Sequence, residues 1–216
     1  MIEIKVIDNF LSSEDLKKLQ KIDLKKPDNK KMSVYVKKIE NDHASGSGMS
    51  DETAKHLHRS YHSIAVNILN ELYPEKTKLY EYSEFGITET GSNYEFPIHN
   101  DTPNKLLSGV IYLAPKQGEG THFYNDKNGN GKKTIEWNIN RAVFFSRHEH
   151  YSWHSFDNKS EEVRRVLIYN LMTNDIKGVC KIENVNYFVS RIKHLINPYL
   201  YRMFKFVIWK LHFLLQ

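Results

Sequence analysis

The sequence predicts a mixed α+β domain in which N-terminal helices support a jelly roll, that is, a double-stranded β-helix. Helical patterns occupy the first third of the chain, and short strand patterns separated by turns follow from about residue 79 to residue 172. Helices and strands do not alternate as they do in parallel α/β folds. A basic and apolar final segment predicts a C-terminal amphipathic helix beside this domain.

The first third of the chain contains one short strand and two helices. Residues 2–7 alternate in the manner of a strand, and Ser12 is a typical N-cap for the helix that follows. Residues 22–48 are rich in Lys, Asp and Gly and predict a loop that is broken by a strand at "SVYVKKI". A long helix is predicted from Asp51 to about residue 72, where Pro74 ends it. The spacing of its apolar residues predicts one buried face, formed by Ala54, Leu57, Tyr61, Ile64, Ile68 and Leu72.

The region after residue 78 predicts seven or eight short strands at the spacing of a β-sandwich or barrel. The strand segments are "KLYEYSEF", "YEFPIHND", "LSGVIYLAP", "GTHFYND", "KTIEWNI", "RAVFFS", "YSWHSF" and "RRVLIYNLM". Residues 83–95 and 147–152 are predicted to be loops that line a pocket, and the first of them is a candidate lid over a substrate.

Composition limits the classes of function. The only cysteine in the 216 residues is Cys180, which excludes a disulfide within the chain and favours a reducing, cytoplasmic compartment. The beginning of the chain lacks the pattern of a signal peptide. The net charge is +5, and residues 178–216 carry six Lys or Arg against one Glu, so the rest of the chain is neutral. A basic surface for nucleic acid is therefore not expected.

The chemistry centres on "FPIHNDTPNK", in which His99 and Asp101 are separated by one residue. In a strand, residues i and i+2 point to the same face, so both side chains can chelate one ion. An imidazole and a carboxylate together with a second imidazole form the facial triad of non-haem iron(II), which leaves positions open for other ligands. "YSWHSF" supplies the second imidazole at His154. His148 and His150, which precede it, are alternatives for this role.

A further cation is expected if a dicarboxylate binds beside the metal. Arg is suited to hold the far carboxylate because its planar guanidinium can donate two parallel hydrogen bonds. "RRVLIYNLM" places Arg164 at the start of an apolar strand, ten residues after His154. Only one of Arg164 and Arg165 can face inward, and Arg164 is the preferred candidate. Tyr112 in "SGVIYLAP" is placed to supply a second donor.

The order of His99-x-Asp101, His154 and Arg164 resembles the iron(II)- and 2-oxoglutarate-dependent dioxygenase superfamily, and within it the prolyl-4-hydroxylase-like branch. The similarity extends from "VIDNFLSSEDL" to "VLIYNLM", about 170 residues. "GVIYLAP" followed by "GEGTHFY", and "NRAVFFS" before "WHSF", are similar to strand motifs of that branch. The sequence departs from the family in a longer segment between Tyr82 and His99, which leaves open whether Tyr82 or Tyr94 reaches the cofactor.

The resemblance implies the following roles. His99, Asp101 and His154 would be the iron ligands, and Arg164 with the help of Tyr112 would bind 2-oxoglutarate. The reaction would consume dioxygen and 2-oxoglutarate, release succinate and carbon dioxide, and hydroxylate an unidentified protein or small molecule, with ascorbate as a candidate reductant. A cupin-like isomerase or sugar-binding protein without redox chemistry is the alternative, because it needs the metal ligands but not Arg164.

The chain is predicted to divide into an oxygenase domain at residues 1–175 and a basic, apolar helical tail at residues 176–216. Within the tail, residues 197–216 predict a helix that begins at Pro198. Such a helix can pack against its own domain, form a homodimer or lie on a membrane surface. A vesicle-flotation comparison of chains with and without residues 197–216 would separate these interpretations.

Overall fold

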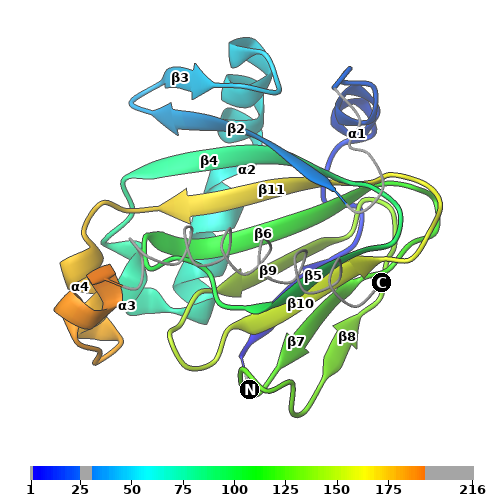
Figure 1. The fold of residues 1–216 in the computed structure, drawn as a ribbon. Coiled ribbons are helices and arrows are strands. Elements are labelled where there is room, and N and C mark those ends of the chain that lie inside the picture. Colours follow the sequence, from blue (N-terminus) through cyan, green and yellow to red (C-terminus); the bar gives the residue numbers. More distant parts are fainter. Residues whose placement is uncertain (1, 25–30, 193–216) are drawn as a thin grey trace.

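The computed structural model describes residues 2–24 and 31–192, which form two antiparallel β-sheets with helices on one side (Figure 1). Four helices lie wholly within the described residues, namely α1 (Ser13–Gln20), α2 (Asp51–Leu72), α3 (Pro74–Thr77) and α4 (Ile176–Ile182), and residues 187–192 are helical as well. The larger sheet has the order β1 (Ile4–Ile7), β9 (Ala142–Ser146), β6 (Lys105–Ala114), β11 (Arg164–Met172), β4 (Tyr82–Thr90), β2 (Met32–Glu40) and β3 (His43–Gly46). The smaller sheet has the order β5 (Tyr94–His99), β10 (Trp153–Asn158), β7 (Thr121–Tyr124) and β8 (Lys133–Ile135).

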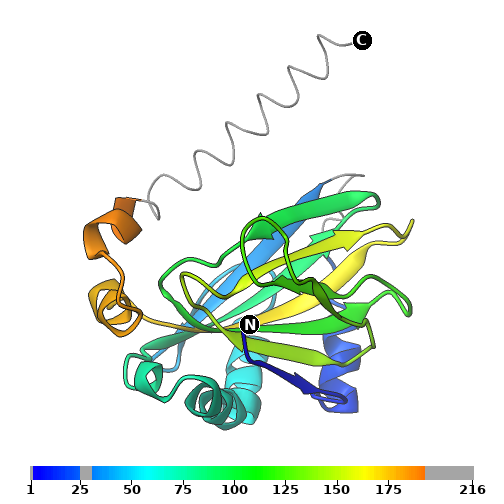
Figure 2. The same ribbon diagram turned by 90° about the horizontal axis from the view of Figure 1, so that it is seen from below.

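The helices α1 and α2 cover the outer face of the larger sheet, and the smaller sheet lies across its other face (Figure 2). Both helices begin with a serine cap, of which Ser12 was predicted from the sequence. The Ser12 hydroxyl accepts a hydrogen bond from the backbone N–H of Asp15, and Ser50 does the same for Thr53. The prediction of N-terminal helices that support the sheet is confirmed in this arrangement. One predicted core residue of α2 was wrong, since Ile64 is 40% exposed and Ala65 is buried in its place.

The strands of the larger sheet separate two kinds of interior. On β11, Leu167, Tyr169 and Leu171 point toward the helices and belong to the main apolar core. The alternate residues Val166 and Ile168 point between the two sheets. A second, smaller core closes one end of the space between the sheets, and it consists of Tyr112, Phe123, Ile135, Val143, Phe145 and Val166. The remainder of that space is a cavity.

The prediction of a loop or lid at residues 83–95 was wrong. Residues 82–90 form β4, a central strand that pairs with β11 from Thr90↔Arg164 to Tyr82↔Met172. Only residues 91–93 form the turn before β5. The segment "KLYEYSEF" predicted the start of this strand, but its continuation to residue 90 was missed because its inward positions look like loop residues in a sequence. These inward positions, Glu84, Gly86 and Thr88, do line the cavity, as was predicted for this segment. They are polar or small because they line a cavity rather than a core.

Two smaller features also differ from the prediction. Pro74 does end α2, but it also begins the short helix α3, where the missing N–H of proline costs nothing. The strand β3 at residues 43–46 pairs with β2 inside a region that was predicted to be loop apart from one strand. Its sequence, "HASG", has no apolar alternation, since only Ala44 is buried.

The described part of the tail packs against the domain. Val179 and Cys180 of α4 are buried, and the Glu183 carboxylate forms an ion pair with Lys76 of α3 at 2.7 Å between Oε1 and Nζ. The division at residue 175 stays a prediction, as do the helix, the homodimer and the membrane contact proposed for residues 197–216, which lie outside the described residues. Among the described helices, none is both long and apolar enough to span a membrane.

Candidate metal centre

His99 and His154 meet because their strands are neighbours. β5 ends at His99, β10 begins at Trp153, and His99 is the register partner of His154 across the antiparallel pair. The two imidazole rings lie 4.2 Å apart between centroids. Asp101 follows two residues after His99, at the mouth of the space between the sheets. The fold thus brings together the three residues that were predicted from the sequence as metal ligands.

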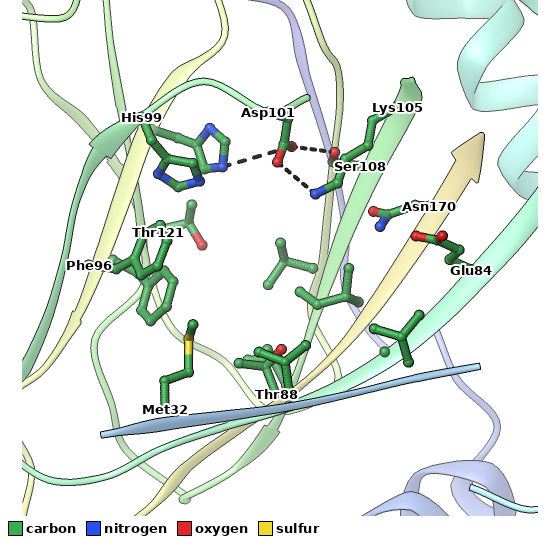
Figure 3. A pocket seen from close by; sticks show the side chains of 18 of the residues that line it. Met32, Glu84, Thr88, Phe96, His99, Asp101, Lys105, Ser108, Thr121 and Asn170 are labelled. Atoms are coloured by element: carbon green, nitrogen blue, oxygen red, sulfur yellow. Dashed lines mark hydrogen bonds and ion pairs between the residues drawn. The ribbon is translucent and has the colours of Figure 1, made fainter. Parts of the chain in front are cut away.

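The three side chains have the arrangement of a metal site. One ligand atom from each of His99, Asp101 and His154 lies within 4.8 Å of the others, and this is the one such cluster of His, Cys, Asp or Glu in the described residues. His154 Nε2 lies 4.0 Å from Asp101 Oδ2. Figure 3 shows the carboxylate of Asp101 between His99 on one side and Lys105 and Ser108 on the other.

Backbone contacts orient both imidazoles. His99 Nδ1 lies 3.0 Å from the carbonyl oxygen of Pro97, and His154 Nδ1 lies 2.8 Å from that of Ser152. A carbonyl only accepts hydrogen bonds, so Nδ1 carries the proton in each ring and Nε2 keeps its lone pair. Burial, and for His99 also the neighbouring His154, lowers the pKa of His99 to about 3 and lowers that of His154. Both rings are thus neutral at pH 7, which is the form that binds a metal.

Asp101 is held in its ionised form. Burial alone raises the pKa of Asp101, but the charge and hydrogen bond of Lys105, together with the neighbouring His154 and His99, outweigh this effect, and the pKa falls below its usual range. Lys105 Nζ donates to Oδ1 at 2.6 Å, and the Ser108 hydroxyl donates to Oδ2 at 2.6 Å. Lys105 occupies Oδ1, and Oδ2 is the oxygen that lies toward His154. Oδ2 still has lone-pair capacity for a metal.

At the closed end of the same cavity lies a buried cation, Arg164. The residue is 1% exposed, and it forms no hydrogen bond or ion pair to any described residue. Its guanidinium carbon lies 4.5 Å from the ring centroid of Phe156 and 5.2 Å from that of Trp137. Burial lowers the pKa of Arg164 to about 10, so the group remains charged at neutral pH. A buried cation without a counterion is costly unless a ligand supplies one.

Arg165 has the opposite environment. It points toward the helices, where Nε and Nη2 donate to Glu89 at 2.8 and 2.6 Å, and Nη1 donates to the backbone carbonyls of Leu19 and Gln20. This arginine is a structural residue that joins β11, β4 and the end of α1. Of the two candidates from the sequence, the structure places Arg164 in the cavity.

Tyr112 does not line the cavity itself, but it is hydrogen-bonded to a residue that does. Its hydroxyl donates to Thr121 Oγ1 at 2.9 Å, and Thr121 lines the cavity whereas Tyr112 is fully buried behind it. The bonded Thr121 hydroxyl keeps its own proton to donate. A role for Tyr112 beside Arg164 stays a prediction, and the geometry makes Thr121 the group that faces a ligand. Neither Tyr82 nor Tyr94 lines the cavity.

Comparison with solved structures identifies the fold. A prolyl-4-hydroxylase from Pseudomonas putida has a TM-score of 0.54 at 13% identity, over 81% of this chain and 94% of that chain. The Trichoplax adhaerens prolyl hydroxylase in complex with a hypoxia-inducible-factor peptide has a TM-score of 0.57 at 16% identity, over 82% and 86%. An auxin-oxidising dioxygenase from Arabidopsis thaliana with 2-oxoglutarate has a TM-score of 0.52 at 11% identity, over 79% and 83%.

The fold is that of the 2-oxoglutarate- and iron(II)-dependent oxygenases. The resemblance seen in the sequence, including the resemblance to the prolyl-4-hydroxylase-like branch, is confirmed at the level of the fold. No protein-family model matches the sequence, and no curated protein matches it. The likeness therefore lies in three-dimensional structure rather than in overall sequence.

Residues 147–152 hold the segment of His99 and Asp101 in place and do not line this cavity, so their prediction as a wall of the substrate pocket was wrong. The Asn100 side chain donates to the carbonyls of His148 and Glu149 at 2.7 and 3.0 Å. Arg147 Nε donates to the carbonyl of Asp101 at 3.1 Å. His148 stacks on Tyr151 at 4.3 Å, outside the His–Asp–His cluster, and His150 also lies outside it.

Several cavity residues were not predicted from the sequence. They are the wall residues Met32, Val34 and Val36 of β2, the polar residues Glu84, Lys105, Ser108, Thr121 and Asn170, and Phe156 under Arg164. Period-two alternation carried a signal for some of them. Ser108 is four residues from Tyr112, and Asn170 is six residues from Arg164, so each shares the inward face of its strand. No sequence signal placed β2 beside the cavity, because β2 reaches it only through pairing with β4.

Proposed function

We propose that this protein is an iron(II)- and 2-oxoglutarate-dependent dioxygenase that hydroxylates its substrate. In the balanced reaction a substrate C–H becomes C–OH and 2-oxoglutarate becomes succinate and carbon dioxide; one atom of dioxygen enters the hydroxyl group and the other enters succinate. The observation that carries the proposal is the pairing, in one cavity of about 260 Å³, of a His–Asp–His cluster with a buried arginine that has no counterion.

The residues at the mouth of the cavity fit iron(II). His99 and His154 offer neutral Nε2 atoms, and Asp101 offers an ionised oxygen, which is the ligand set of the 2-His-1-carboxylate centres. When it is bound, iron(II) supplies the activation of dioxygen and the coordination of the 2-oxo acid. The protein's part is to fix the three ligands through the Pro97, Ser152 and Lys105 contacts before the metal arrives.

The residues at the closed end fit the distal carboxylate of 2-oxoglutarate. Arg164 would pair with it, and the Thr121 hydroxyl, which is oriented by Tyr112, would donate a further hydrogen bond. Phe156 and Trp137 hold the guanidinium between ring faces, so it presents its N–H groups in one direction. The apolar walls Val110, Val166 and Phe145 keep water away and strengthen this ion pair.

The alternative of a jelly-roll metal protein without redox chemistry does not account for Arg164. A sugar-binding protein or an isomerase would use the metal ligands, but neither requires a buried, unpaired cation at the opposite end of the cavity. A dicarboxylate co-substrate requires one. This difference supports the oxygenase interpretation over its competitor.

Formation of succinate tests the proposal. The purified protein with iron(II), ascorbate, oxygen and 2-oxoglutarate should form succinate slowly on its own and faster with a substrate. A His99→Ala variant should form none, and an Arg164→Met variant should need far more 2-oxoglutarate. The matched control is Arg165→Lys, which keeps a cation on the helix side and should retain activity. Succinate formation by wild type that never exceeds the His99→Ala level, with any candidate substrate, would refute the proposal.

A further inference from the structure

The cavity has a second polar patch, formed by Glu84 of β4 and Asn170 of β11. The two residues are register partners on neighbouring strands, and both line the cavity (Figure 3). Asn170 is six residues from Arg164 along β11, which is about 20 Å between Cα atoms at 3.3 Å per residue. A five-carbon dicarboxylate held by Arg164 is too short to reach this patch as well. The patch is therefore available to a different ligand.

Neither side chain of the patch has its hydrogen-bonding capacity filled. Asn170 is 4% exposed, and its Oδ1 is buried without a hydrogen-bond partner among the described residues. Glu84 is half-buried and forms no ion pair within the described part of the chain. Burial raises the pKa of Glu84, while Lys105 and the Asn170 side chain oppose this rise. The Glu84 carboxylate thus offers an acceptor to the cavity, and the unpartnered Oδ1 of Asn170 lies beside it.

The two lysines nearest to the patch are engaged elsewhere. Lys105 Nζ donates to Asp101 Oδ1 at 2.6 Å, the oxygen that faces away from His154. Lys38 Nζ pairs with Glu40 at 2.9 Å. Metal binding through Asp101 Oδ2 leaves the contact of Lys105 in place. The acceptors of Glu84 and Asn170 consequently need a donor from outside the protein, and a cation is favoured because one acceptor is a carboxylate.

The wall beside the patch is aliphatic. Val34 and Val36 of β2 and Ile168 of β11 line the cavity next to Gly86, the inward neighbour of Glu84. A Cβ at Gly86 would meet its nearest atom, Ile168 Cβ, at 3.5 Å, which is an ordinary van der Waals contact, so a side chain could be added at this position without a clash at Cβ. This surface fits methylene groups.

We propose that the substrate carries a primary ammonium group on an aliphatic chain, and that Glu84 and Asn170 bind this group. The inference rests on the proposed oxygenase function and specifies its substrate class. The ammonium group is bound but not changed, and a C–H bond of the chain held near His99, Asp101 and His154 is the one that becomes C–OH. The oxidant is dioxygen with 2-oxoglutarate, as in the balanced reaction above.

Calorimetry without turnover tests the inference. Protein loaded with manganese(II) and 2-oxoglutarate is titrated in the absence of oxygen with n-alkylamines of three to six carbons and with the matching alcohols and carboxylates. At least one amine should bind, its alcohol should bind tenfold or more weakly, and its carboxylate should not bind. Glu84→Gln should weaken amine binding by tenfold or more. The matched control Glu95→Gln, an exposed carboxylate outside the cavity, should leave it unchanged.

Two further binding measurements determine the length of the aliphatic chain and the kind of molecule that carries the ammonium group. Gly86→Val should shorten the longest amine accepted, because the new side chain occupies the aliphatic wall. A lysine residue blocked at both ends, compared with the free amines, shows whether the ammonium comes from a protein side chain or from a small molecule. The inference is overturned if no amine or blocked lysine binds, if carboxylates bind as well as amines, or if Glu84→Gln has no effect. Binding of 2-oxoglutarate itself, measured first, shows whether the oxygenase proposal still stands in that case.

Discussion

Arg164 and Arg165 are adjacent in the chain and have opposite surroundings. Arg165, on the helix face of β11, has an ion pair with Glu89 and two carbonyl partners from α1. Arg164, on the cavity face, lies among aromatic rings with no partner in the described residues. The comparison teaches that a fully satisfied buried charge supports the fold, whereas an unsatisfied one indicates a missing ligand. We therefore expect side chains on the helix face of the larger sheet to determine stability, and side chains on its cavity face to determine function.

The largest effect is expected on the helix face. Arg165→Met leaves the buried carboxylate of Glu89 without its cation, and the free energy of unfolding should fall by about 3–5 kcal/mol. Urea unfolding of the metal-free protein measures this loss. The double variant Arg165→Met, Glu89→Leu should recover much of it because no charge is then left unpaired. A loss below about 1 kcal/mol in the single variant would contradict the division between the two faces.

Replacement of Arg164 by Met should weaken the binding of 2-oxoglutarate without lowering the free energy of unfolding. Arg164→Met removes an uncompensated buried charge, so the free energy of unfolding should stay level or rise. Affinity for 2-oxoglutarate should fall about a hundredfold, which is about 2.7 kcal/mol. Calorimetry on the manganese-loaded protein measures the affinity, with Arg165→Lys as the control. Collapse of stability together with unchanged affinity would assign Arg164 to the fold instead.

A third region sharpens the comparison because it joins the fold to the metal ligands. Glu183 accepts hydrogen bonds from both Lys76 and Arg147, and Arg147 also donates to the backbone carbonyl of Asp101. Glu183→Gln should lower the free energy of unfolding by about 1–3 kcal/mol and weaken metal binding about tenfold. The control Glu149→Gln removes a less buried partner of Arg147. Unchanged metal affinity in a destabilised Glu183→Gln protein would make this network purely structural.

The smallest effect is expected for Ser108→Ala, on the cavity face. The Ser108 hydroxyl donates to Asp101 Oδ2, so its loss should weaken metal binding by about tenfold and change stability by about 1 kcal/mol or less. A metal titration followed by a competing chelator measures the affinity. Ser155→Ala, whose hydroxyl pairs with that of Tyr124, is the matched control and should bind the metal normally. Equal affinities of the two variants would remove Ser108 from the site.

The sequence was sufficient for features that depend on local pattern. The cap at Ser12, the long helix and the inward pair His99 and Asp101 follow from spacing within a few residues. His154 and Arg164 were found because the chemistry of a metal and a dicarboxylate demanded them. The structure brings all four side chains to one cavity, while their roles as ligands stay predictions.

What could not be predicted depends on pairing between distant strands. The continuation of β4 through residues 86–90 looks like a loop because its inward positions are small or polar, and only the register of β4 with β11 shows that Glu84 meets Asn170. The contact of β2 with the cavity has the same origin. The anchoring of Asp101 by Arg147 and Glu183 joins residues 82 positions apart, for which spacing gives no signal.

The central claim is that one cavity binds iron(II) at His99, Asp101 and His154 and 2-oxoglutarate between that iron and Arg164. Anaerobic visible spectroscopy tests it most directly. Addition of 2-oxoglutarate to the iron(II)-loaded protein should produce a weak charge-transfer band that saturates at one equivalent per chain. The band should be absent from His99→Ala, and it should require more 2-oxoglutarate in Arg164→Met. A wild-type protein that binds iron(II) and 2-oxoglutarate but shows no band, or a band unchanged in both variants, would contradict the account.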